Sequence, residues 1–375
     1  MKIRMQLHSL LIGLVFTGAA ATESADDLKR FGSNPATGSS QAITVGDVPL
    51  VHTAQLFATD DPSEFAILSP ADQTARALNR LGDRLAEAKS GLDHVVKLNF
   101  YVSSQDAVRA VEKAVADRFG KGHSQPAISW VISKLPQNAV KVAVDAVATT
   151  DLPDLDKIQV ERGSSPAWTV IPRGTRIYIA GQAEPGQSLA EMTRKTMTSL
   201  SDTLKFLGRG DADIVQLKAF LQPISDLTEV QRTLREFFGQ RPVPPTVFVE
   251  WTGKRSIEIE VVAWGGRDQK GPAVEYLTPP LMKASPVYSR VARINHSPSI
   301  YISGLYAASP AGPEPGSGQM PEAGEREVKE IFATLASILK QSGSDLKHLV
   351  KATYYCSTDA ASQKLNALRP SYYDP

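Results

Sequence analysis

The sequence predicts an α/β protein, more finely an α+β protein, in which one module is used three times. Three strand-like runs, at residues 95–102, 214–221 and 349–356, resemble one another position by position. Each run is followed by a helical pattern that ends in an aromatic residue, and the interval is 22 residues in every copy: Lys97 to Phe119, Gln216 to Phe238, and Lys351 to Tyr373. Equal intervals that each span two elements indicate an internal repeat.

The order of the predicted elements is the same in each module. A β-rich run opens the module, at residues 50–55, 176–182 and 299–305. A helix follows: in the third module, apolar side chains recur every three or four residues from Val328 to Leu339, which places them on one helical face. The core strand and a second helix come next.

The first and second modules then close with a predicted β-hairpin. Its strands are expected at residues 127–132 and 140–148 in the first module, and at 246–251 and 257–263 in the second. The last strand alternates apolar and polar residues, so one of its faces should be buried. The module is therefore predicted as β-β-α-β-α-β-β, with one sheet and two helices on one face.

The chain divides into a signal peptide, a flexible lead-in and three modules, at residues 1–21, 22–40, 41–150, 151–268 and 280–375. The lead-in is polar and rich in Ser and Gly, a composition typical of disorder. The third module stops at Pro375, where its closing hairpin is due. Because unpaired sheet edges are prone to aggregate, we expect the third module to be incomplete at its C-terminus and the sequence to be a fragment of a longer chain.

The N-terminus has the pattern of a secretory signal peptide. Lys2 and Arg4 precede a short apolar run at residues 10–16, and small residues at 18–21 follow. A basic start, a short apolar core and a small-residue site indicate cleavage, here near Ala21. The apolar run is too short to span a bilayer. We therefore predict export to the periplasm or the medium, without membrane attachment after cleavage.

Composition disfavours several classes of function. The net charge of +1 and the lack of basic tracts argue against a nucleic-acid binder. No cluster has metal-ligand spacing, and no phosphate loop or nucleophile elbow occurs, so we predict neither a metal nor a cofactor. The single cysteine, Cys356, is expected to be a small buried apolar residue. Lys97 and Lys351 are expected to be solvated or to snorkel rather than to form a Schiff base.

These features resemble the RidA family, also called YjgF or enamine/imine deaminase proteins. The residues that carry the resemblance are Ala180-Gly181-Gln182, the core strand at 95–102, the helix ends Phe119-Gly120 and Phe238-Gly239, and the closing strands at 140–148 and 257–263. Their order and spacing recur along nearly all of the mature chain, and this recurrence makes the resemblance specific.

The resemblance implies a chorismate-mutase-like fold. Members of the family form homotrimers, in which three sheets make a central barrel with the helices outside and small molecules bind in clefts between subunits. A chain with three modules would supply one such trimer by itself, so we expect an intramolecular pseudo-trimer with a small-molecule ligand in its inter-module clefts. The sequence does not indicate any oligomer beyond that.

The resemblance also implies an activity, the hydrolysis of reactive enamines and imines to keto acids and ammonia. An Arg that opens the closing hairpin would clamp the substrate carboxylate, and a Glu on the last strand would manage the water. At the Arg position this chain has Ile128 and Thr246, and at the Glu position it has Ala143 and Glu258. Glu258 is thus the candidate catalytic residue. The alternative is that Glu258 has no role in catalysis and only belongs to the polar face of a strand in which apolar and polar residues alternate.

Gln55 and Gln182 follow the small residue that ends an opening strand, and they are candidate ligand-binding residues together with Ile128 and Thr246. The alternative to ligand binding is that the two glutamine side chains only cap a turn.

Two functions stay open. One is a hydrolytic deaminase of enamine or imine metabolites that uses another anchor, such as Arg173, Arg176 or Arg290. The other is a catalytically degenerate, exported protein that binds a small metabolite or serves as a scaffold, which the lost arginines favour. Nuclease activity, assigned to some family members, is disfavoured by the neutral charge.

Overall fold

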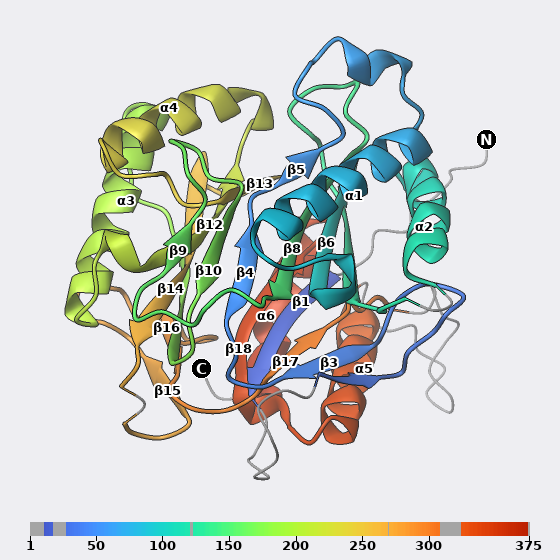
Figure 1. Ribbon diagram of the computed structural model, residues 1–375. Coiled ribbons are helices and arrows are strands. Elements are labelled where there is room, and N and C mark those ends of the chain that lie inside the picture. Colours follow the sequence, from blue (N-terminus) through green and yellow to red (C-terminus); the bar gives the residue numbers. More distant parts are fainter. Residues whose placement is uncertain (1–10, 18–27, 121–122, 269, 308–323, 374–375) are drawn as a thin grey trace.

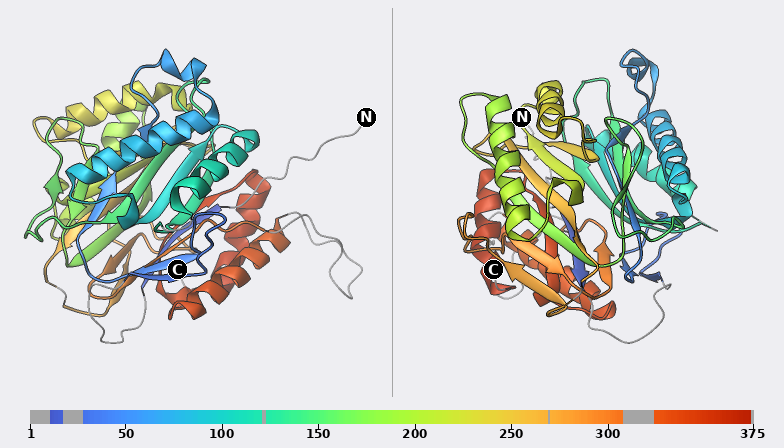
Figure 2. Two further views of the ribbon diagram at one scale, coloured as in Figure 1. Left: turned by 45° about the vertical axis from the view of Figure 1, so that its right-hand side comes forward. Right: turned by 60° about the vertical axis from the view of Figure 1, so that its left-hand side comes forward.

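The computed structural model describes residues 11–17, 28–120, 123–268, 270–307 and 324–373. They form three β-sheets with two long helices against each sheet, as Figures 1 and 2 show. Within these residues, no helix is long and apolar enough to cross a membrane.

The first sheet has the strand order β7-β6-β8-β4-β10-β9, and β5 pairs with β8. Helices α1 and α2 cover its outer face (Figure 1). The bounds of these elements are β4 (Leu50–Thr53), β5 (Leu56–Phe57), α1 (Pro70–Glu87), β6 (Val95–Val102), α2 (Gln105–Phe119), β7 (Ala127–Ile132), β8 (Val142–Thr149), β9 (Gln159–Val160) and β10 (Trp168–Ile171).

The second sheet repeats the same plan, with the strand order β13-β12-β14-β11-β16-β15. Helices α3 and α4 pack on it with an apolar core of their own. The bounds are β11 (Thr175–Gln182), α3 (Leu189–Phe206), β12 (Ile214–Leu221), α4 (Leu227–Phe238), β13 (Thr246–Glu250), β14 (Ile257–Gly266), β15 (Val274–Leu277) and β16 (Val291–Ile294).

The third sheet has the order β18-β1-β17-β3-β2, and α5 and α6 cover it. Strand β1 pairs antiparallel with both β17 and β18, in the place that β8 and β14 take in the other two sheets. The bounds are β1 (Leu11–Thr17), β2 (Lys29–Phe31), β3 (Ala42–Val45), β17 (Ser299–Ile302), α5 (Glu325–Gln341), β18 (Leu349–Tyr355) and α6 (Asp359–Leu368).

Strand β1 belongs to the segment predicted to be the apolar core of a signal peptide, whose other residues lie outside the described part. The range predicted as a flexible lead-in, residues 22–40, contains β2, which pairs with β3. Its last residue, Ser40, donates its backbone N–H to Pro126 O at 3.0 Å. The described part of the lead-in is therefore tied to both the first and the third sheets.

The predicted closing hairpin is wrong in both modules in which it was expected. Strand β7 pairs parallel with β6, and β8 pairs antiparallel with the other edge of β6, so β6 lies between the two closing strands. The same arrangement holds for β13, β12 and β14. The burial of the core strand explains this result. Seven of the eight residues of β6 are buried, and a strand that is buried on both faces is best paired along both edges.

In each module, the strand that precedes the opening strand joins the sheet of a neighbouring module. Strand β10 pairs with β4, β16 pairs with β11, and β3 pairs with β17. Each module therefore adds a strand to the sheet of the module before it, and the first module adds one to the sheet of the third, so the three sheets form a closed ring. This arrangement fits an intramolecular pseudo-trimer.

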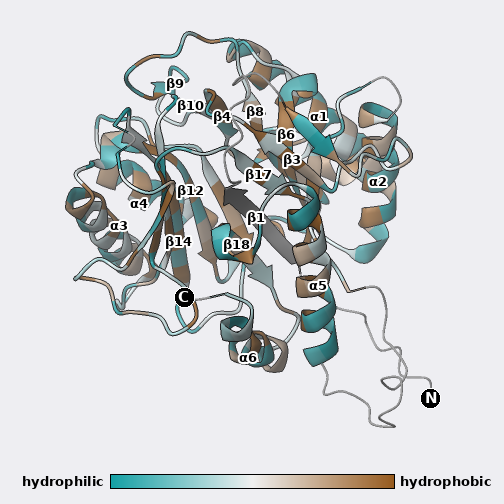
Figure 3. Cartoon of the chain, turned by 90° about the horizontal axis from the view of Figure 1, so that it is seen from below, coloured by the Kyte–Doolittle hydropathy of each residue, from teal (hydrophilic) through white to brown (hydrophobic). Residues whose placement is uncertain are grey.

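A shared apolar core lies where the three sheets face one another. It contains Val96 of β6, Val215 of β12 and Val350 of β18, together with Leu50, Tyr178 and Tyr301 of the opening strands. Figure 3 shows β12, β14 and β18 towards the middle of the molecule and the helices α2, α3 and α6 at its periphery. The core strands thus present one face to their own helices and the other to the centre.

Candidate functional site

A cavity of about 1140 Å³ lies between the second and third modules. Its walls come from β11, β12 and β14 on one side and from β18 and α6 on the other, and residues 132–134 of the first module, at the end of β7, also line it. The loop that follows β13, with Trp251 and Lys254, contributes to its rim. We call this cavity the 2–3 cleft.

Glu258 is the predicted site residue that lines the 2–3 cleft. Its neighbours on β14, Ile257 and Ile259, are buried in the core under α3 and α4, so the alternation of the strand turns Glu258 to the other face. The carboxylate lies against the backbone of Gly181, where a Cβ atom would collide with Oε1. A glycine at position 181 is therefore needed for Glu258 to occupy this place.

The surroundings of Glu258 favour its protonated form. Burial, and to a smaller extent the charge of Glu260, raise its pKa to about 7, although Arg290 opposes the shift. Among the described residues, no side chain or backbone group forms a hydrogen bond with this carboxylate. A carboxyl group that titrates near neutral pH at the wall of a cleft has the property required of a general acid or base.

The 2–3 cleft also contains a guanidinium with only neutral partners among the described residues. Arg369 donates from Nε to Tyr373 Oη at 2.6 Å and from one terminal nitrogen to Asn366 Oδ1 at 3.0 Å. Its guanidinium lies over the rings of Tyr354 and Tyr288, at 4.8 and 5.4 Å from their centroids. The aromatic rings hold the cation in place and leave its charge available to an anionic ligand.

Arg290 also contacts Tyr288, with its guanidinium 5.0 Å from the centroid of the ring. Its guanidinium donates to Tyr288 Oη at 2.7 Å and to Lys283 O at 2.7 Å. Its backbone O accepts from Ala180 N at 2.9 Å, next to Gly181. Arg290 thus lies within electrostatic reach of Glu258, whereas Arg173 and Arg176, the other suggested anchors, pair with Asp154 and Asp47.

Cys356 also lines the 2–3 cleft and is half-buried. Burial raises the pKa of its thiol, and the hydrogen bond with Ser362 and the charge of Arg369 only partly oppose this. A thiol of raised pKa is a poor nucleophile. Among the described residues, no group of His, Cys, Asp and Glu side chains could hold a metal ion.

The other predicted residues lie at different junctions. Gln55 is buried where the first and second modules meet: its N–H donates to Thr246 O at 3.2 Å, and its Oε1 accepts from Phe248 N at 3.2 Å. Ile128 is buried in the first core, and its N–H donates to Ser303 Oγ of the third module at 2.7 Å. Gln182 donates to Thr203 Oγ1 at 3.2 Å, beneath α3, and is not part of the wall of the 2–3 cleft.

The junction between the first and second modules is filled. Ala143, at the position equivalent to Glu258, packs in an apolar cluster with Tyr101, Phe220 and Val249. Thr246, at the position expected for the clamp, donates its hydroxyl to Pro244 O at 2.8 Å. Sequence reasoning placed these residues correctly along the strands, but the site residue Arg369 was missed, because it comes from the last helical turn of a neighbouring module and has no counterpart in the motif.

Three comparisons with known proteins bear on this arrangement. Residues 32–150 match the model of the family described as Endoribonuclease L-PSP. The first module is thus similar to this family over its whole length. The resemblance to RidA and YjgF proteins is thereby confirmed for that module, and the second sheet repeats its strand order. No curated protein matches the chain.

Solved structures of YjgF and related proteins are also similar. A YjgF family member from Neisseria meningitidis is 21% identical, covers 35% of this chain and 100% of its own, and has a TM-score of 0.24. A YjgF/YER057c/UK114 family member from Mycobacterium tuberculosis is 26% identical, with coverages of 33% and 100% and a TM-score of 0.23. A putative endoribonuclease from Thermotoga maritima is 25% identical, with coverages of 33% and 98% and a TM-score of 0.25.

Proposed function

We propose that the 2–3 cleft binds a small imino acid or enamine and hydrolyses it to a keto acid and ammonia, with Glu258 as the general acid and base. The observation that carries the proposal is the pKa of Glu258, raised to about 7 on the wall of a cavity of about 1140 Å³. A group that is partly ionised at neutral pH can accept a proton in one step and donate it in the next.

An enamine first takes a proton from solvent at its β-carbon and becomes the iminium form, in which an imino acid also reacts. Hydrolysis of the iminium then needs two proton transfers, one from the attacking water and one to the leaving amine. Ionised Glu258 takes a proton from water as the water oxygen bonds to the iminium carbon, and the C=N electron pair moves to nitrogen. Protonated Glu258 then gives its proton to the amine of the resulting carbinolamine. The C–N bond breaks, the carbonyl forms, and ammonia leaves with the hydroxyl proton as ammonium.

Arg369 is the proposed anchor for the substrate carboxylate. The position expected for the clamp holds Ile128 and Thr246, neither of which can bind an anion through charge. Arg369 supplies a guanidinium to the same cavity that Glu258 lines, and its printed partners are tyrosine and asparagine side chains. A planar guanidinium can hold a carboxylate through two parallel hydrogen bonds.

The test is ammonia release from a freshly generated imino acid by the full chain and two variants. Glu258→Gln should lower kcat/KM by about 100-fold or more, since it removes acid-base catalysis. Arg369→Lys should mainly raise KM, by about 10-fold or more, because the two-point contact is lost.

Glu236→Gln and Arg232→Lys are matched controls, since these residues form an exposed ion pair on α4. Both controls should keep the wild-type rate. If the wild-type chain does not accelerate the reaction over buffer, the proposal is wrong, and small-molecule binding without catalysis becomes the function to test.

Cleavage of RNA, which the description of the family names, is not proposed for this cleft. Its wall carries four acidic residues beside five basic ones, so its charge is nearly balanced, whereas a phosphate backbone is bound best where basic residues clearly dominate. Export remains part of the proposal, on the pattern of residues 1–21 alone. Cleavage near Ala21 would remove β1 from between β17 and β18, so the exported chain would lack this strand of the third sheet. N-terminal sequencing of the protein recovered from the native cell tests the proposal.

A further inference from the structure

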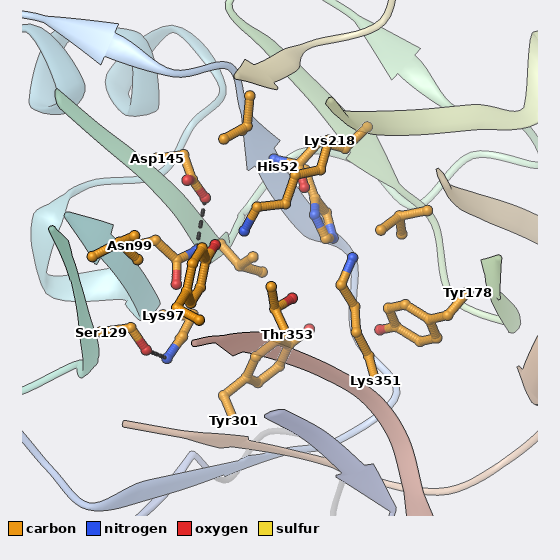
Figure 4. A pocket seen from close by; sticks show the side chains of 16 residues that line it. His52, Lys97, Asn99, Ser129, Asp145, Tyr178, Lys218, Tyr301, Lys351 and Thr353 are labelled. Carbon is orange, nitrogen blue, oxygen red and sulfur yellow. Dashed lines mark hydrogen bonds between the residues drawn. The ribbon is translucent and has the colours of Figure 1, made fainter. Parts of the chain in front are cut away.

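A second, smaller cavity of about 70 Å³ lies where the three core strands face one another (Figure 4). Side chains of a strand alternate between its faces, so every second residue of each core strand points to this centre. The inward pairs are Lys97 and Asn99 of β6, Gln216 and Lys218 of β12, and Lys351 and Thr353 of β18. We call this the central cavity.

Three lysines line the central cavity. Lys97 is 5% exposed, which contradicts the expectation that it is solvated. Its Nζ donates to Ser129 Oγ at 2.5 Å and to Ile302 O at 2.6 Å, and both acceptors are neutral. Lys351 pairs with Glu260 at 3.0 Å.

Lys218 has neither a hydrogen bond nor an ion pair among the described residues. Its Nζ lies over the rings of Tyr101, Tyr355 and Phe220, at 5.6, 5.8 and 5.9 Å from their centroids. Figure 4 shows its side chain reaching into the same space as those of Lys97 and Lys351.

The carboxylates near the cavity are fewer than the lysines. Asp145 accepts from Asn99 Nδ2 at 2.9 Å and from Tyr101 Oη at 2.7 Å. Burial raises its pKa, although the charge of Lys218 and these hydrogen bonds oppose the shift. Glu260 is engaged with Lys351. Three lysine side chains thus face two carboxyl groups. Burial lowers the pKa of Lys97 to about 7, so Lys97 is only partly charged at neutral pH. Lys218, which is half-buried, keeps a charge without a hydrogen-bonded partner among the described residues, and withdrawing such a charge from water is costly unless an anion compensates it.

Polar atoms without a partner surround the same space. His52 lines the cavity, is 4% exposed, and its Nδ1 has no hydrogen-bond partner. Burial and the charges of Arg176 and Lys351 lower its pKa to about 3, although a hydrogen bond with Gln216 opposes the shift, so the ring is neutral. The hydroxyl of Tyr355, which also lines the cavity, is buried and unpaired as well.

We infer that the central cavity binds a small anion, either a carboxylate or an inorganic oxyanion, as the missing partner of Lys218 and its unpaired neighbours. One water molecule needs about 10–15 Å³ of such a volume. The cavity of about 70 Å³ therefore has room for an ion of roughly four or five non-hydrogen atoms. Acetate, nitrate and phosphate are of this size.

The central cavity has walls in common with the 2–3 cleft. Tyr178, Lys351, Thr353 and Tyr355 line both the central cavity and the 2–3 cleft, so the two spaces adjoin. The inference does not depend on catalysis in the cleft, because it rests on the charges and unpaired atoms of the central cavity alone.

The experiment measures thermal unfolding of the full chain in millimolar acetate, nitrate or phosphate. The reference is a bulky sulfonate, too large to enter, at the same ionic strength. A small anion that binds the folded protein alone should raise the Tm by about 2 °C or more at saturation. Lys218→Met, which keeps the length of the side chain, should remove this rise.

Lys254→Met is the control, since Lys254 is exposed at the rim of the 2–3 cleft and does not line the central cavity. Asn99→Asp is a second test that leaves the volume unchanged and adds a competing negative charge, so it should also remove the rise. The inference is overturned if no small anion stabilises the wild-type chain, or if the rise is the same in Lys218→Met, Asn99→Asp and Lys254→Met.

Discussion

The junction between the first and second modules and the cleft between the second and third are built on the same plan but differ in what fills them. At the first junction, Ala143 lies among Tyr101, Phe220 and other apolar side chains, and Gln55 joins the opening strand to the edge of β13. At the second, Glu258 faces a cavity of about 1140 Å³, and Gln182 points beneath α3 instead. Equivalent strands thus give either a closed joint or a candidate site.

The comparison teaches that the backbone plan does not by itself decide where a site lies. Ala143 and Glu258 occupy matching positions, since both lie across from the core strand, at Tyr101 and at Phe220. A small apolar residue lets neighbouring aromatic rings close over it. A carboxylate at the same position needs water, a ligand or a shifted pKa, because a buried charge without a partner is unstable.

The largest expected effect on stability comes from placing a carboxylate at the junction between the first and second modules, as Glu258 does in the 2–3 cleft. Ala143→Glu would bury a carboxylate among apolar side chains that leave it no space and no partner, and it should lower the free energy of unfolding by about 3 kcal/mol or more. Urea unfolding followed by circular dichroism measures this. Ala143→Ser, which adds a small polar atom, should cost less, and equal losses in the two variants would argue against charge burial as the cause.

The fold could be predicted further than the site. The core strands at 95–102 and 214–221 coincide with β6 and β12, because an apolar run bounded by turn residues is a strong local signal. The closing strands were also located, but their pairing was not, since local alternation does not say which strand lies between two others. Arg369 and Lys218 were missed because each gains its role from residues of other modules.

The second prediction concerns the pH dependence of stability, which separates Glu258 from Ala143. The pKa of Glu258 is raised from 4.5 to about 7 in the folded protein, so the folded state holds this proton more tightly than the unfolded chain. Glu258 therefore opposes folding increasingly as the pH rises from about 4.5 to about 7, and it has no such effect below that range.

Glu258→Gln should consequently gain stability relative to the wild type over this range, by about 2–3 kcal/mol between pH 4.5 and pH 8. Unfolding curves of both proteins at several pH values measure the difference. A constant difference across the range would mean that Glu258 titrates normally and that the cleft is more polar than its lining indicates.

The third prediction uses Gly181, against which the Glu258 carboxylate packs. Gly181→Ala places a methyl group where Oε1 lies, so the carboxylate must move, and the variant should lose about 1–2 kcal/mol of stability. In a Glu258→Ala background, the same substitution should cost much less, because the collision is gone. Additive losses in this double-mutant cycle would show that Gly181 is needed for its backbone and not for the place of Glu258.

The smallest effect distinguishes the two glutamines. Gln55→Ala removes the acceptor of Phe248 N across the joint between the first and second modules, which leaves a buried N–H unpaired and should cost about 1–2 kcal/mol. Gln182→Ala loses its contacts with Thr203 Oγ1 and with Met282 Sδ. The Thr203 hydroxyl keeps its bond to Ser199 O and a thioether is a weak acceptor, so the cost should be below that of Gln55→Ala. Thermal unfolding of the two variants side by side tests the order. The reverse order would mean that the joint is held by its apolar cluster alone and that Gln55 is free to serve a ligand.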